Sequence, residues 1–239
     1  MRILTWVLVA VACLGVILAL IGLGIYGFDF ERVSADLHGD HHYEARSINV
    51  TDSDTVPHTI NIKVRSLNIV VREGAEFGVE YYYNLHYSMV EYTIENGILD
   101  AEFGHRWSFR IMNWQRSRHA TVTITVPYAF GGILNLESRS GNVNVQTVEV
   151  NAININARSG NITMDRVTAN SINIENRSGN NRITVSGARS EFYISTSNRS
   201  GVTRIAGSRV SSRHTEGAGN ARIVTISSRS GNNTLNFIA

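Results

Sequence analysis

The triplet Arg-Ser-Gly recurs in this chain at Arg139, Arg158 and Arg177, always 19 residues apart. After Gly141 and Gly160, apolar residues stand at the same six offsets, which are 2, 4, 7, 9, 12 and 14. Alternation within each pair is typical of a β-strand with one apolar face, and the extra residue between pairs marks a corner. Each repeat therefore predicts three short strands and three corners, which together form one coil of a β-solenoid with a shared apolar axis.

Two more triplets begin at Arg199 and Arg229, but they are 30 residues apart. We therefore expect a loop or a degenerate coil between them. After Gly179 and Gly231 the first apolar pair stands two residues later than in the regular repeats. The matching shift predicts the same two-residue bulge at both corners.

The repeat also extends toward the N-terminus in a weaker form. Arg46-Ser47-Ile48 and Arg65-Ser66-Leu67 are again 19 residues apart, so we expect the solenoid to begin near Arg46 and to occupy residues 46–239. Asn96-Gly97 lies between apolar runs and predicts a hairpin. Because open strand edges invite aggregation, we expect a loop, this aromatic hairpin region or another molecule to cover an end of the stack.

The N-terminus predicts a membrane anchor. Residues 3–28 carry no charge over 26 positions, and about 20 apolar residues span a bilayer. Arg2 precedes this run and acidic residues follow it, which predicts a cytoplasmic N-terminus and an extracytoplasmic domain. We thus expect a single-pass anchor at 1–28 in the cell membrane and a juxtamembrane linker at 29–45. An alternative makes Cys13, the single cysteine, a lipidated residue.

These features together resemble a known bacterial family. The anchor, the strand that ends at Pro127 and the Ser-Gly-Asn turns at Ser140, Ser159 and Ser178 are similar to the membrane-anchored β-strand-repeat proteins of unknown function called the putative adhesin family. The resemblance implies a β-solenoid on the outer face of the membrane, in a family often linked to the cell envelope and its stress responses. It supplies no catalytic residues.

Arginine dominates the charge of the repeat region. From Ser138 to Ala239 there are twelve arginines against five carboxylates, a net charge of +7. Arg139, Arg158 and Arg177 are expected at the same corner of neighbouring coils, about 4.8 Å apart. At this distance two positive charges repel by about 0.8 kcal/mol even in water. The repeat therefore predicts a site for an anionic polymer along an arginine ladder, defined as Arg139, Arg158, Arg177, Arg199 and Arg229. An alternative is that each guanidinium hydrogen-bonds corner carbonyls or pairs with Glu137 and Glu175.

The remaining triplet residues have structural roles in this interpretation. We expect a positive φ angle at Gly141, Gly160 and Gly179. We expect hydrogen bonds from the hydroxyls of Ser140, Ser159 and Ser178 to the turn backbone. The residue after each glycine is asparagine, which predicts an asparagine ladder at Asn142, Asn161 and Asn180.

The sequence argues against an enzyme, a metal site and a cofactor. The five carboxylates after Ser138 are scattered, and no pair of aspartates recurs at the coil spacing. An extracytoplasmic position also argues against nucleic acid as a partner. We therefore expect a non-enzymatic, adhesin-like surface protein that binds an envelope polymer or a surface partner. The alternative is an envelope-stress or regulatory membrane protein, with the solenoid as a sensor or scaffold for a membrane protein.

Overall fold

The structure is a computed structural model that describes residues 14–15, 17–18, 44–48, 56–83, 88–105, 121–218 and 222–238. Residues 14–15 and 17–18 are helical and exposed. In this described part, no helix combines the length and the apolarity that crossing a membrane requires. The predicted anchor at 3–28 and linker at 29–45 lie almost wholly outside the described residues.

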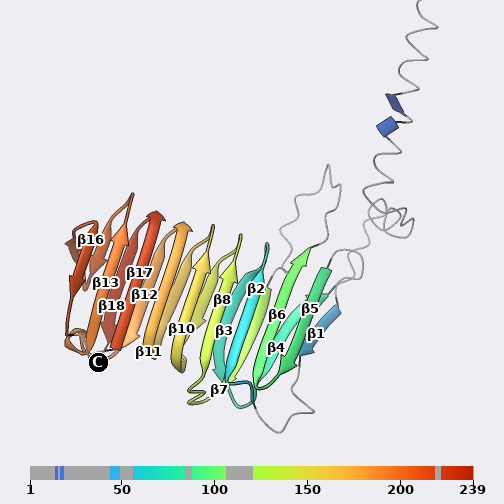
Figure 1. Ribbon diagram of the computed structural model, residues 1–239, viewed down its shortest axis with the longest axis horizontal. Helices are drawn as coiled ribbons and strands as arrows, with labels where there is room; N and C mark the ends of the chain where they lie inside the picture. Colours follow the sequence, from blue (N-terminus) through green and yellow to red (C-terminus); the bar gives the residue numbers. More distant parts are fainter. Residues whose placement is uncertain are drawn as a thin grey trace, which may run out of the picture.

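The described residues form an all-β structure, one curled sheet of 18 strands with two facing walls (Figure 1). Wall A contains, in spatial order, β1 (Glu44–Ile48), β4 (Gly78–Tyr83), β7 (Thr121–Pro127), β3 (Asn68–Gly74), β9 (Val143–Gln146), the first part of β11 (Ile162–Ser178), β12 (Asn181–Ser186), β18 (Asn233–Ile238), β14 (Thr203–Ile205) and β15 (Ser208–Val210). Wall B contains β5 (Ser88–Glu95), β6 (Ile98–His105), β2 (Thr59–Val64), β8 (Ile133–Ser138), β10 (Glu149–Ala157), the second part of β11, β17 (Arg222–Ser230), β13 (Phe192–Asn198) and β16 (Arg213–Glu216). A 3-10 turn, η1 (Arg189–Glu191), precedes β13.

The central coils stack in parallel with the predicted 19-residue period. Leu134 pairs with Ile153, and Ile153 pairs with Ile172, so equivalent residues of successive coils lie side by side. All three side chains are fully buried between the walls. The three predicted sides are not three separate strands, because Val150 and Ile153 both belong to β10 in wall B; the predicted break in the inward alternation is present between them, at Asn151 and Ala152. Each coil therefore has one strand segment in each wall.

The predicted bulge after Gly179 and Gly231 is also wrong. Asn181 pairs with Ile162 of the preceding coil, so the chain enters β12 in the regular register. The first inward-facing position of the strand, which is apolar in the regular coils, is occupied by the buried Asn181 in β12 and by the buried Asn233 in β18. The Asn181 side chain donates to Asn233 Oδ1 over 2.7 Å, which satisfies polar groups that would otherwise be costly to bury. The same buried network includes Asn176, Asn198, Thr203 and Ser228.

The coils do not stack in the order of the chain. The coil of β2 and β3 lies between the β6–β7 coil and the β8–β9 coil. Its corner at Arg65-Ser66-Leu67 confirms the weaker repeat at that point. Arg46 is not at a corner, because β1 runs antiparallel to β4 with Arg46 opposite Tyr81. The prediction of a parallel coil beginning at Arg46 is therefore wrong.

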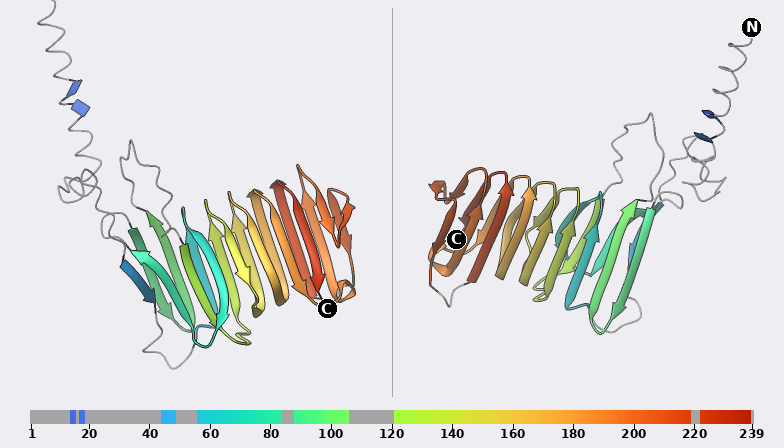
Figure 2. Two further views of the ribbon diagram at one scale, coloured as in Figure 1. Left: turned by 180° about the vertical axis from the view of Figure 1, so that it is seen from behind. Right: turned by 45° about the horizontal axis from the view of Figure 1, so that its top comes forward.

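The last coil of the chain is likewise inserted into the stack rather than added at its end. Strands β17 and β18 lie between the β11–β12 coil and the β13–β14 coil (Figure 2). Arg222, at the start of β17, donates to the carbonyl oxygens of Ala169 and Ser186 over 2.8 Å and 2.7 Å. Its guanidinium also lies 4.5 Å from the centre of the Phe192 ring. Arg222 thus joins three segments around the inserted coil.

Both ends of the stack are covered, whereas the sequence predicted a cover for one end. At the end that holds β1, the hairpin of β5 and β6 turns at Asn96-Gly97, where both φ angles are positive, and antiparallel β4 covers β7. At the other end, antiparallel β15 and β16 cover β14 and β13. Glu216 of β16 lies opposite the buried Ile194. A carboxylate thus closes this end of the apolar interior, which protects an exposed edge.

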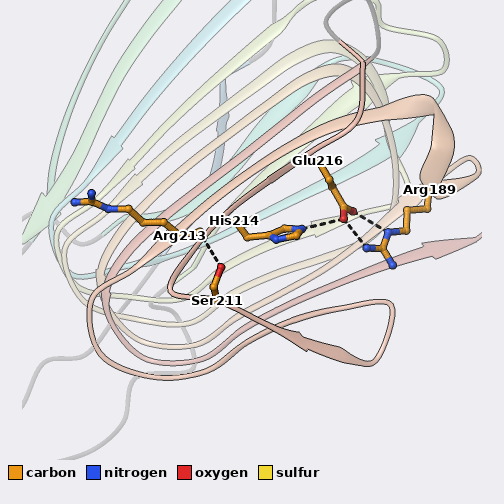
Figure 3. Close-up of polar contacts among 5 residues, drawn as sticks. All are labelled: Arg189, Ser211, Arg213, His214 and Glu216. Carbon is orange, nitrogen blue, oxygen red and sulfur yellow. Dashed lines mark hydrogen bonds and ion pairs between the residues drawn. The ribbon is translucent and has the colours of Figure 1, made fainter.

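The closing carboxylate is held by a bidentate ion pair (Figure 3). Arg189 of η1 donates to both Glu216 oxygens over 2.7 Å and 2.6 Å. His214 Nε2 lies 2.9 Å from the same carboxylate. The hydrogen bonds from Arg189 are the main reason that the pKa of Glu216 falls to about 2.

We expect Glu216→Gln to lower the free energy of unfolding by about 1–3 kcal/mol at pH 7, because the charge-assisted hydrogen bonds are weakened. A lowered carboxyl pKa contributes stability above the unfolded value of about 4.5, and this contribution is lost as the pH falls toward 2. The difference between parent and variant in urea-unfolding curves should therefore shrink below about pH 4.5. Glu95→Gln, which changes an exposed carboxylate, is the control; an equal difference at pH 7 and pH 2.5 would contradict the prediction.

Candidate binding surface

The structure assembles the arginine ladder at one corner of the stack. Main-chain hydrogen bonds join the corners of successive coils, with Arg158 N donating to Ser138 O and Arg199 N donating to Ser228 O. Pairing of Ser178 with Ser230 places the Arg229 corner next to the Arg177 corner. The spatial order is therefore Arg139, Arg158, Arg177, Arg229 and Arg199, which brings the last two residues together in the reverse of their chain order.

The backbone of this corner explains why each triplet ends in glycine. Gly141, Gly160 and Gly179 have φ angles of 142°, 134° and 132°, as predicted. A Cβ atom on Gly160 would lie 2.1 Å from the carbonyl oxygen of Gly141. The corners therefore stack too closely for any side chain at this position.

The asparagine ladder is confirmed, but the predicted role of the serines is not. Asn161 N donates to Asn142 Oδ1, and Asn180 N donates to Asn161 Oδ1, each over 2.9 Å. Within the described part of the chain, the hydroxyls of the triplet serines make no hydrogen bond. Their main-chain carbonyls accept from the neighbouring coil instead, as Ser159 O does from Gly141 N. The serine side chains therefore face solvent beside the arginines.

The five guanidinium groups of the ladder are exposed. Within residues 56–83, 88–105, 121–218 and 222–238 they make no ion pair and no side-chain hydrogen bond. The alternative contacts with Glu137 and Glu175 are therefore absent from the described residues. Arg65, in the next coil toward β1, differs because it pairs with Glu102 over 2.9 Å. The ladder proper therefore presents unneutralised positive charge to solvent.

A second polar surface lies on the outer face of wall B, and we did not predict it. A groove of about 650 Å³ runs across β5, β6, β2, β8, β10 and β11. Its floor holds a row of linked asparagines, in which Asn154 donates to Asn135 over 2.8 Å and Asn135 donates to Asn61 over 2.7 Å. Asn61 donates in turn to Asp100 over 2.6 Å. The recurrence of asparagine at 135, 154 and 173, again 19 residues apart, was the signal in the sequence.

More arginines gather at the end of the stack that holds β15. Arg182 of β12 and Arg204 of β14 share the outer face of wall A, separated by Thr234. Arg209 of β15 lies directly opposite Arg204 in an antiparallel pair. Like charges in directly opposed positions destabilise a sheet, so the pairing of Arg204 with Arg209 lowers the stability of this end.

The described residues include no group of three or more histidine, cysteine or acidic side chains that could hold a metal ion. Comparison with known proteins identifies the family. A family model described as Toastrack DUF4097 matches residues 58–237, which is most of the chain. The chain belongs to the Toastrack DUF4097 family. This confirms the predicted membership of a β-repeat family of unknown function.

Solved structures show how far this Toastrack chain resembles other proteins. A putative cell adhesion protein from Clostridium sporogenes is 13% identical, with a TM-score of 0.58 over 82% of this chain and 100% of that one. A putative adhesin from Bacteroides fragilis is 12% identical, with a TM-score of 0.35 over 83% of this chain and 98% of that one. No curated protein matches the Toastrack chain. The first likeness shows a shared fold.

Proposed function

We propose that this Toastrack protein is a non-enzymatic, adhesin-like surface protein: a single-stack β-solenoid on an N-terminal membrane helix that binds an anionic envelope polymer. The observation that carries the proposal is the exposed arginine ladder, with no ion pair to any described residue. Guanidinium groups bind carboxylate and phosphate groups in bidentate geometry. A row of five on adjacent coils therefore suits a polymer with repeated negative charges.

Three further observations support this reading. The solenoid lengthens the basic surface without lengthening any loop, because each coil adds one arginine at the same corner. The structural neighbour from Clostridium sporogenes carries the name of a cell adhesion protein. The uncharged run at residues 3–28 would hold the binding surface at the outer face of the cell membrane.

The test uses the full chain in nanodiscs of neutral lipid, co-sedimented with purified bacterial cell walls across a salt series. We expect binding that weakens with salt, because exposed charges are screened, and at least tenfold weaker binding after Arg139→Gln, Arg158→Gln and Arg177→Gln. The matched control removes three arginines elsewhere, with Arg182→Gln, Arg204→Gln and Arg209→Gln. Equal losses of cell-wall binding in both triple variants would show that net charge, and not the arginine ladder, causes the binding, and would contradict the proposal. No binding by the parent would refute it as well.

A further inference from the structure

Two rows of outward side chains run side by side along the outer face of wall B. The carboxylate row contains, in register across five strands, Glu102, Lys63, Glu137, Asn156 and Glu175. The arginine ladder stands two residues further along each strand, so that Arg139 follows Glu137 and Arg177 follows Glu175. Both rows are on the outer face because the residue between them, such as Ser138, points inward and is buried.

Glu102 pairs with Arg65 in its own copy, but the other charges that the contact would use lack strong partners within one copy. Arg139, Arg177 and Glu175 make no ion pair with any described residue. Glu137 has only Lys63, at 3.6 Å, and both side chains are more than half exposed. Exposed pairs of this kind contribute about 0–1 kcal/mol. The two rows therefore carry opposite charges that remain available to another surface.

We propose that two copies of this chain associate through the outer faces of wall B, with the arginine ladder of each copy against the carboxylate row of the other. A two-fold axis that runs along the stack, midway between the rows, exchanges one row for the other. It places Arg139 opposite Glu137 of the second copy and Arg177 opposite Glu175. The projecting corner of each copy then enters the groove of about 650 Å³ beside the carboxylate row.

Three features favour a second copy over another occupant. The spacing of Glu137 and Glu175 matches that of Arg139 and Arg177, because both rows repeat at the same strand separation of about 4.8 Å; between them, Arg158 would face the neutral Asn156. A two-fold contact satisfies both rows at once, as is usual for homodimers. An axis along the stack also leaves the two β1 ends adjacent, which two chains anchored in one membrane require. Arg65 would face Lys63; Arg65 is paired with Glu102 in its own copy, whereas Lys63 would share Glu137 with Arg139 of the second copy.

The test exchanges charge between the rows. One variant carries Glu137→Arg and Glu175→Arg, so that both of its rows are basic; the other carries Arg139→Glu and Arg177→Glu, so that both are acidic. The full chain and both variants are studied by sedimentation equilibrium in a density-matched non-ionic detergent. We expect the parent to dimerise at low salt, each variant alone to dimerise at least tenfold more weakly, and an equimolar mixture of the variants to form a heterodimer.

Restored association in the mixture also shows that both variants are folded. A parent chain that stays monomeric at low salt overturns the proposal and leaves the face to another occupant. Dimers that persist in either variant alone, or a mixture that stays monomeric, overturn it as well. The second copy and the proposed polymer would bind the same arginine ladder, so they would compete for it. The two proposals are tested separately, because Glu137→Arg and Glu175→Arg should weaken the dimer at least tenfold while cell-wall binding in the co-sedimentation assay is kept.

Discussion

Replacing Gly160 with alanine is expected to lower the free energy of unfolding by about 3–5 kcal/mol. The φ angle of 134° is in a region that residues with a side chain rarely adopt. The added Cβ would also lie 2.1 Å from Gly141 O and 2.7 Å from Gly141 C, which are main-chain atoms that cannot rotate away. Relief requires separating two stacked coils, and the hydrogen bonds at that corner would weaken with them. Urea unfolding followed by circular dichroism measures the effect.

Gly207→Ala is the matched control. This glycine also has a positive φ angle, of 81°, but a Cβ atom there would meet nothing within 4 Å. Only the conformational strain remains, and we expect a loss of about 1 kcal/mol. Equal losses at the two positions would show that close stacking of the corners contributes nothing, and would contradict the explanation of the Arg-Ser-Gly repeat.

Deleting residues 222–239 is expected to have an even larger effect, because this segment fills the interior of the stack. The deletion removes the parallel partners of β11, β12, β13 and β14 at once. It also removes the fully buried side chains of Val224, Ile226 and Leu235, which together contribute about 5–9 kcal/mol. We expect the β13–β16 region to lose its protection from hydrogen exchange, while the coils around β8 and β10 stay protected.

The control for this deletion keeps the inserted coil and changes only its outer surface. Thr225→Ala and Ser227→Ala replace side chains that point away from the core, and we expect them to change the free energy of unfolding by less than about 0.5 kcal/mol each. A truncated chain in which β13 exchanges as slowly as in the parent would contradict the inserted position of β17 and β18.

The arginine corner could be predicted from the sequence because its determinants are local. A glycine with positive φ, an asparagine after it and an alternating apolar pair all lie within a few residues, and the 19-residue period places copies of them in register. The groove on wall B was missed although Asn135, Asn154 and Asn173 repeat with the same period. Its other side, with Asn61 and Asp100, comes from strands far away in the chain, so no spacing in the sequence connects them.

The sequence by itself determined the strand character, the period of the central coils, the identity of the corner residues and the hairpin at Asn96-Gly97. Only the tertiary structure decided the order of the coils, because an inserted coil and an added coil have the same local pattern of apolar residues. The order of the coils depends on pairing between strands that are far apart in the chain, and on single contacts such as those of Arg222 with Ala169 and Ser186. Hydrogen bonding between strands is satisfied equally well by any parallel neighbour, so the burial of specific side chains selects the partner.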